Sequence, residues 1–390
     1  MRTPRSFLLL YLAIALISLG ACRKQASNQP TANSNDAAAH DAPVGGKALT
    51  GDKFYFRGTI AGDLSIEMTL VRDGERLTGT YFYPRVGKNI TLGGTVDKAG
   101  NVELKESDES GKETGVFKGQ WKPATDSPDP NLNEIEGKWS KLDGSKVAPF
   151  QVSQQPIEFT GAVRVTPKVI KEANKGKHYR VDAEYPQIEG DPRFDNFNRE
   201  ARSLITKDVA AFKTGETSEA TSAESNPDNV LADEARESTL DIGYEIRCAT
   251  DDLISVEFSE ATYEAGAAHG NSATTVLNYD VKNGKKVALA DLFTPKSNYL
   301  SVISTYCIKD LRDRAKKDKD AMLDEEMMKS GASPKADNYQ AVAITKKGLW
   351  VTFDQYQVAA YAAGPQTVLV PYSALKDIIK PDGPVAAFAK

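Results

Sequence analysis

The sequence predicts a multi-domain protein in which an all-β antiparallel meander, a small barrel or sandwich, is followed by an α+β domain pair. Two observations predict this fold class. Short segments of alternating polarity, separated by turn residues, fill residues 51–152 without a helical pattern between them. From residue 153 onward, strand patterns are interleaved with apolar stripes at helical spacing, which is typical of α+β proteins.

The chain begins with a pattern typical of a bacterial lipoprotein. Arg2 and Arg5 precede an apolar run over residues 7–21, which is shorter than the roughly 20 residues that a membrane-spanning helix needs. Cys22 directly follows Leu-Gly-Ala, as in a lipobox. We therefore expect residues 1–21 to be a signal peptide and Cys22 to carry a lipid anchor. An ordinary signal peptide with an incidental cysteine is the alternative.

Residues 22–50 are rich in Ala, Asn, Ser, Asp and Pro and contain almost no large apolar side chains, so we expect a flexible tether. The anchored chain would face the periplasm or the exterior of the cell. Arg23 stands where enterobacterial lipoproteins retained at the inner membrane carry Asp. An outer-membrane location is therefore expected if the cell has an outer membrane.

Charge and motifs argue against several classes of function. The formal net charge is −5, and it becomes −7 without the two arginines of residues 1–21. Basic clusters are lacking, so nucleic acid is not an expected partner. The sequence has no two-cysteine or His-Glu-x-x-His zinc motif, no Gly-x-Ser-x-Gly elbow and no glycine-rich phosphate loop. Because these motifs are absent from the sequence, we predict no catalytic residues of these classes, no metal site and no cofactor.

Within residues 51–152, the clearest strand pattern places Leu64, Ile66, Met68 and Leu70 on one face. A turn at residues 72–74 leads to a returning strand. The strands expected in this domain are 64–70, 77–83, 90–96, 102–104, 115–121 and 135–142.

Residues 153–250 form the first expected α+β segment, and residues 251–390 the second α+β domain. The first contains strands near 158–165, 178–185 and 240–249, a helix over 195–214 and a surface loop over 215–233. The second contains a strand that ends at residue 280 and strands over 253–262, 287–289, 340–345, 349–353 and 366–370. It also contains a long helix over 296–329 and a short helix that begins at Pro371.

Apart from the expected lipidation site at Cys22, the sequence contains two cysteines. Cys248 and Cys307 both continue apolar faces, and an even pair in an exported chain is a candidate disulfide. Two separate buried thiols are the alternative, because a pair of cysteines fixes no geometry.

A candidate binding cleft is centred on His269, which lies among small residues between two expected strands. Asp354, Tyr356 and Tyr361 could approach it in three dimensions. A catalytic histidine would need such a partner, whereas a hydrogen-bonded structural histidine would not. Residues 352–356 read Thr-Phe-Asp-Gln-Tyr, which departs from the Thr-Phe-Asp-Asp-Gly metal motif of polysaccharide deacetylases, so they do not form that active site.

A set of short motifs runs from Tyr185 to the C-terminus: Tyr185-Pro186-Gln187-Ile188, Asn196-Phe197-Asn198, Gly266-Ala267-Ala268-His269, Asn278-Tyr279-Asp280, Asn283-Gly284-Lys285, Asp291-Leu292-Phe293, the run over 353–365, and Pro371-Tyr372-Ser373-Ala374-Leu375. With these motifs, this part of the chain resembles the extracytoplasmic module shared by the anti-sigma factor RsiV and the peptidoglycan deacetylase PdaC.

The resemblance implies a non-catalytic envelope domain, with a PdaC-like part over residues 153–250 and an RsiV-like part over 251–390. We therefore expect a membrane-anchored lipoprotein that binds or senses peptidoglycan, or a cationic wall-active protein such as lysozyme. One alternative is a hydrolase that acts on cell-wall material through His269 and Asp354. Another is a structural lipoprotein that takes part in envelope assembly.

Overall fold

The computed structural model describes residues 51–125, 131–219, 237–318 and 322–390. The expected signal peptide, Cys22 and the expected tether over 22–50 lie outside the described residues. Residues 44–390 cluster as one compact unit. No described helix is both long enough and apolar enough to cross a membrane.

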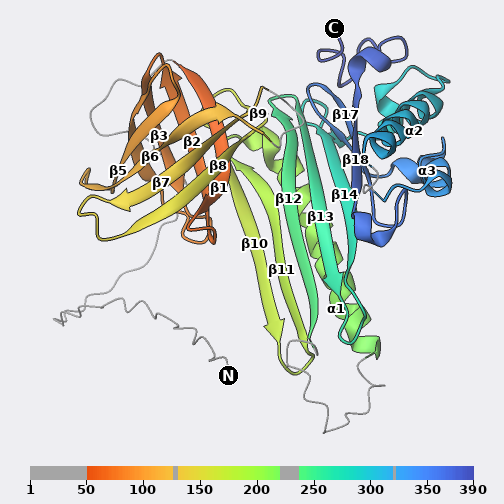
Figure 1. The fold of residues 1–390 in the computed structure, drawn as a ribbon, viewed down its shortest axis with the longest axis horizontal. Helices are drawn as coiled ribbons and strands as arrows, with labels where there is room; N and C mark the ends of the chain where they lie inside the picture. The colour runs from red at the N-terminus through yellow and green to blue at the C-terminus, as the bar shows by residue number, and fades with distance from the viewer. Residues whose placement is uncertain (1–50, 126–130, 220–236, 319–321) are drawn as a thin grey trace, which may run out of the picture. The chain divides into compact units, whose positions relative to one another are not determined.

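The N-terminal part is a closed antiparallel barrel of strands β1 to β8, in which each strand pairs with the next and β8 pairs with β1 (Figure 1). This confirms the predicted meander and decides for a barrel. The strands are β1 (Asp52–Ile60), β2 (Leu64–Asp73), β3 (Arg76–Phe82), β4 (Ile90–Val96), β5 (Asn101–Ser107), β6 (Glu113–Pro123), β7 (Asn133–Lys141) and β8 (Val147–Gln155). Strands β1 and β8, the pair that closes the barrel, were not among the individual strands expected from the sequence.

Apolar side chains fill the barrel, because alternate residues of each strand point inward. Phe56, Leu70 and Phe117 are among those with at most 1% of their surface exposed. Several strand contacts require glycine, and Gly58 and Gly94 are two examples. A Cβ on Gly58 would lie 2.0 Å from the carbonyl oxygen of Gln151, and one on Gly94 would lie 1.9 Å from that of Glu103.

The middle of the chain folds into one sheet in the order β10-β11-β12-β13-β14-β15, with β9 paired to the end of β12. The strands are β9 (Ile157–Glu158), β10 (Arg164–Asn174), β11 (Tyr179–Glu189), β12 (Ser238–Thr250), β13 (Leu253–Tyr263), β14 (Asn271–Asp280) and β15 (Lys285–Lys286). Because β12 and β13 pair along their length, the domain boundary expected at residue 250 falls inside this sheet.

Helix α1 (Asp195–Glu219) packs on this sheet through a buried stripe that includes Phe197, Ala201 and Ile205. The helix begins where the sequence predicts but continues to Glu219, so the start of the loop expected over 215–233 is helical. Residues 220–236 lie outside the described part of the chain. The strand expected over 158–165 is wrong: Gly161, with φ of +81°, turns the chain between β9 and β10.

The C-terminal part contains helices α2 (Tyr299–Lys317) and α3 (Glu325–Gly331) and a three-stranded antiparallel sheet. The strands are β16 (Val342–Ile344), β17 (Gly348–Phe353) and β18 (Gln366–Pro371). The single helix expected over 296–329 is wrong. Asp318 has extended backbone angles at the end of α2, and the Asp324 carboxylate accepts a hydrogen bond from Met327 N to begin α3.

Other short elements also differ from the sequence prediction. The strand expected at 287–289 is replaced by β15 and the 3-10 helix Leu289–Leu292. The helix expected from Pro371 is only the 3-10 helix Tyr372–Ala374, yet Leu375 is fully buried as its apolar character requires. Further 3-10 helices in the described part of the chain are Pro192–Phe194, Ala336–Tyr339 and Tyr361–Ala363.

Candidate functional site

The structure brings three of the four predicted cleft residues into ring contact. His269 comes from the turn before β14, Tyr356 from the turn after β17, and Tyr361 from the 3-10 helix that follows. The ring centroids of His269 and Tyr361 are 4.2 Å apart, and those of Tyr356 and Tyr361 are 5.5 Å apart. We call His269, Tyr356 and Tyr361 the aromatic platform.

Backbone contacts fix the platform. The Tyr361 hydroxyl donates a hydrogen bond to the carbonyl oxygen of Gly270 at 2.9 Å, and His269 Nδ1 lies 2.8 Å from the same oxygen. Tyr356 has a φ of +65°, which is rare for a residue other than glycine, and its side chain remains 55% exposed. The loop therefore holds a large ring toward solvent at a conformational cost of about 1 kcal/mol or more.

Asp354, the fourth predicted residue, lies beside the platform and contacts β14. Its Oδ2 accepts a hydrogen bond from Thr274 N on β14 at 3.2 Å. Its Oδ1 is buried and has no hydrogen-bond partner, and the same holds for Oε1 of Gln355. Among the described residues, no hydrogen bond joins Asp354 to His269: Asp354 accepts from Thr274 N, and His269 Nδ1 lies beside the Gly270 carbonyl oxygen.

Trp350 and Thr352 on β17, and Asp354 directly after it, contact residues of the central sheet. The guanidinium of Arg247 lies over the Trp350 ring at 4.8 Å, and Arg247 Nε lies 3.1 Å from a Glu257 carboxylate oxygen. Thr352 Oγ1 donates to a Glu257 carboxylate oxygen at 3.3 Å, and Asp354 accepts from Thr274 N on β14. These contacts tie β17 and the residue after it to β12, β13 and β14.

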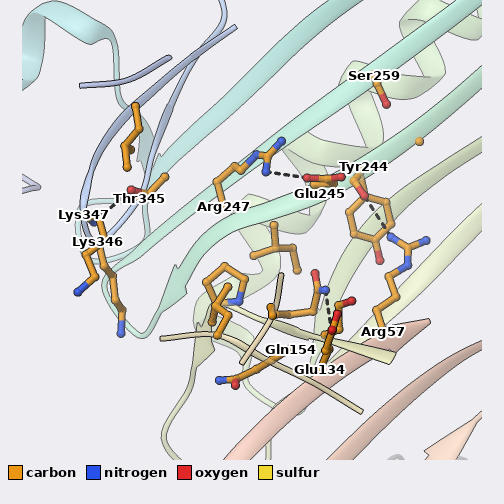
Figure 2. A pocket seen from close by; sticks show the side chains of 18 of the residues that line it. Arg57, Glu134, Gln154, Tyr244, Glu245, Arg247, Ser259, Thr345, Lys346 and Lys347 are labelled. Carbon is orange, nitrogen blue, oxygen red and sulfur yellow. Dashed lines mark hydrogen bonds and ion pairs between the residues drawn. The ribbon is translucent and has the colours of Figure 1, made fainter. Parts of the chain in front are cut away.

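A pocket of about 590 Å³ lies between the outer face of the barrel and β12 (Figure 2). Its lining includes side chains from the barrel, from β12 and from the turn between β16 and β17; those labelled in Figure 2 are Arg57, Glu134, Gln154, Tyr244, Glu245, Arg247, Ser259, Thr345, Lys346 and Lys347. This pocket was not predictable from the sequence, because its lining residues are far apart in the chain. The only local signal is the polar outer face of β8.

Arg57 joins the barrel to the central sheet at this pocket. Its guanidinium pairs with Glu184, donates to the carbonyl oxygen of Tyr244 at 3.1 Å and lies 4.3 Å from the Tyr244 ring centroid. Glu67 Oε1 is 3.3 Å from Arg57 Nε but makes no hydrogen bond. Burial raises the pKa of Glu67 to about 8, because desolvation outweighs the attraction of Arg57 and Glu184 adds repulsion.

The two cysteines are both buried and free, so the structure does not contain the predicted disulfide. Cys248 lies on β12, while Cys307 lies in the core of the C-terminal part with Ile303 and Leu311. Burial raises the pKa of each thiol to about 12. Of the two interpretations made from the sequence, separate buried thiols describe this arrangement.

Among the residues that the structure describes, no group of three or more His, Cys, Asp or Glu side chains is arranged to hold a metal ion.

Comparison with protein families relates the second half of the chain to known domains. Residues 172–272 match the family described as Deacetylase PdaC, and residues 290–373 match the family described as Protein of unknown function (DUF3298). The C-terminal region carries a PdaC domain and a DUF3298 domain. This confirms the resemblance inferred from the sequence.

The chain is similar to Peptidoglycan-N-acetylmuramic acid deacetylase PdaC of Bacillus subtilis strain 168, with 32% identity over 145 residues. The match covers 37% of this chain and 30% of that protein, so the chain spans less than a third of the length of this relative.

Two solved structures are also similar. A DUF3298 family member from Bacteroides fragilis NCTC 9343 has 17% identity and a TM-score of 0.45, and covers 60% of this chain and 99% of that one. A DUF3298 family protein from Pseudomonas aeruginosa PAO1 has 19% identity and a TM-score of 0.40, and covers 57% of this chain and 96% of that one.

The aromatic platform draws on both matched domains. His269 lies within the PdaC match, whereas Tyr356 and Tyr361, like Asp354, lie within the DUF3298 match. In contrast, the barrel residues that line the pocket, such as Arg57, lie outside both matches.

Proposed function

We propose that this chain is an extracytoplasmic cell-envelope module that binds the glycan of peptidoglycan on the aromatic platform, without catalysing its cleavage. The proposal is supported by its relationship to PdaC, a protein named for a reaction on peptidoglycan N-acetylmuramic acid. We further propose that Cys22 holds the chain at a membrane.

The observation that carries the proposal is the exposed platform itself. The C–H face of a sugar ring packs on an aromatic face, and nearby polar groups then select the orientation of the sugar. Tyr356 and Tyr361 supply adjoining rings on which such a sugar can lie. The Tyr356 ring stays exposed beside a second aromatic ring, which leaves it available for recognition.

The test measures sedimentation of the detergent-solubilised full-length chain with insoluble peptidoglycan. Tyr356→Gly removes the ring and relieves the positive φ. We expect binding to weaken about tenfold or more, as for loss of an aromatic anchor, without a lower melting temperature. Lys296→Gly is the matched control, because Lys296 is also exposed and also has a φ of +65° but lies in the turn before α2. Equal binding by the two variants would refute the proposal.

We propose lysozyme, a cationic wall-active protein, as a second ligand to test in the same assay. The supporting observations are the net charge of −5 and the RsiV-like sequence of the C-terminal part. Binding should weaken as salt increases, since attraction between exposed charges is screened. Failure of the full-length chain to retain lysozyme at low ionic strength removes this ligand.

The two other hypotheses from the sequence predict different results with the same material. A hydrolase that uses His269 and Asp354 would release soluble fragments from peptidoglycan, and His269→Ala would stop the release. An assembly role would require an envelope protein bound through the barrel, where Leu64, Val86 and Val147 are exposed.

A further inference from the structure

The pocket of Figure 2 contains an open edge of β12. On the side away from β13, β12 pairs with β11 up to Ile242 and with β9 from Ala249 onward. Among the described strands, none pairs with this edge over residues 243–248. Arg57 donates to the carbonyl oxygen of Tyr244 on this edge, and because backbone groups alternate along a strand, the N–H and C=O of Ile246 face the same side.

Facing this edge is a polar surface of the barrel. The alternation of β8 places Phe150 and Val152 inside the barrel and Gln151 and Ser153 outside it. Both outer side chains line the pocket, together with Gln154. The pocket thus offers amide and hydroxyl groups opposite a row of backbone amides.

The charges of the pocket are largely neutralised by neighbouring side chains. Arg57 pairs with Glu67 and Glu184, Arg247 with Glu245 and Glu257, Lys346 with Glu158, and Glu134 with Lys122. An anion entering the pocket would have to displace these carboxylates. An uncharged ligand with many hydrogen-bonding groups fits this surface better.

We propose that this pocket binds an N-acetylated saccharide, whose acetamido group pairs with the open edge of β12 while its hydroxyls bond to the outer face of β8. An acetamido group carries one N–H and one C=O, as a peptide unit does, and can therefore complete the pairing that β12 lacks. The volume of about 590 Å³ lies within the range of small-ligand sites.

One row of paired residues in the central sheet leads from the pocket to Asp354, which lies beside the platform. Gly243, which lines the pocket, is paired with Ser259, and Ser259 is paired with Thr274, whose N–H is held by Asp354. Adjacent strands are about 4.8 Å apart, so about 10 Å separates the two ends of this row. The inference rests on the proposed function, because one glycan could then occupy both sites through successive sugars.

The test uses the full-length chain and three small probes, measured by calorimetry. They are the disaccharide N,N′-diacetylchitobiose, its deacetylated form chitobiose, and N-acetylalanine methylamide, which carries the amides without a sugar. We expect binding of the acetylated disaccharide alone. Equal binding of chitobiose would refute acetamido recognition, and binding of the peptide analogue in place of the sugar would make the pocket a peptide site.

Two variants locate the binding. Ser153→Trp fills the pocket from β8, and Val147→Trp places the same side chain on the same outer face of that strand, away from the pocket lining. We expect at least a tenfold loss of disaccharide binding for Ser153→Trp and none for Val147→Trp. If Ser153→Trp fails to fold, Gln151→Ala gives the same comparison with a smaller loss. Equal affinities for the pocket variants and wild type would overturn the proposal.

The outcomes separate this inference from the proposed function. Loss of peptidoglycan sedimentation in Tyr356→Gly, combined with no disaccharide binding in wild type, leaves the platform proposal standing and refutes the pocket. Disaccharide binding that depends on Ser153, combined with full sedimentation of Tyr356→Gly, supports the pocket and refutes the platform.

Discussion

Glu67 is a carboxyl side chain whose buried environment opposes its charge at neutral pH. It shares Arg57 with Glu184, and its Oε1 has no hydrogen-bond donor. Its folded-state pKa of about 8 lies above the ordinary value of 4.5, so the folded protein holds this proton more tightly than the unfolded chain does. The resulting stability is fully present below about pH 4.5 and is lost as the pH rises through 8.

We therefore predict that Glu67→Gln stabilises the protein more at pH 8.5 than at pH 5, because glutamine keeps the shape and carries no charge. Urea unfolding at the two pH values measures the difference. Glu103→Gln is the control, since Glu103 forms a solvent-exposed ion pair with Lys118 on the barrel surface and its replacement should have a small effect at both pH values. An equal stability difference for Glu67→Gln at both values would contradict the assignment.

Individual residues of the platform were predictable from sequence, but their contacts were not. His269 stands out as an imidazole among small residues, and residues 353–365 carry a family resemblance. The unpartnered oxygen of Asp354 and the positive φ of Tyr356 depend on how the loop after β17 is held by Gln357, which donates hydrogen bonds to the carbonyl oxygens of Gly331 and Asn338.

At the scale of elements, the closely packed strands of the barrel depend on individual glycines. Gly93 and Gly94 are neighbours on β4, yet a Cβ on Gly94 would meet the backbone of Glu103, whereas nothing lies within 4 Å of a Cβ on Gly93. We predict that Gly94→Ala lowers the free energy of unfolding by about 2 kcal/mol, as overpacking does, and that Gly93→Ala changes it little. Thermal unfolding of both variants decides this, and equal melting temperatures would contradict it.

Elements with strong alternation were predictable, and those set by capping or pairing were not. The strand around Leu64–Asp73 follows from period-two apolar residues. The helix expected over 296–329 is divided because the Asp324 side chain caps the start of α3. Asp324 stands among many other charged residues, so its sequence context did not mark it as a helix start. Strand β10 contains Pro167 and several charged residues, so its pairing with β11 cannot be inferred from its own pattern.

At the scale of the whole molecule, the barrel and the central sheet meet at Arg57, and the pocket lies beside this contact. The domain order was predictable from composition and periodicity. The pocket was not, because β8 and β12 lie nearly 90 residues apart and each is an ordinary amphipathic strand by itself. Because the pocket is formed by residues from separate strands, no short sequence motif marks it.

Membrane attachment is a property of the whole chain that Cys22 is expected to determine. We predict that Cys22→Ala moves the exported protein from the membrane fraction to the soluble fraction and abolishes labelling by radioactive palmitate. Cys248→Ala is the control and should remain in the membrane fraction, because Cys248 is buried within β12. Membrane association of Cys22→Ala equal to that of wild type would show that the anchor lies elsewhere.

The central claim is recognition of wall glycan by the aromatic platform, and the ratio of two dissociation constants tests it most directly. The full-length Tyr356→Gly and Lys296→Gly variants are titrated with insoluble peptidoglycan under identical conditions. We predict that the dissociation constant of Tyr356→Gly is higher by about tenfold or more, at equal or higher melting temperature. Equal dissociation constants for two folded variants would contradict it.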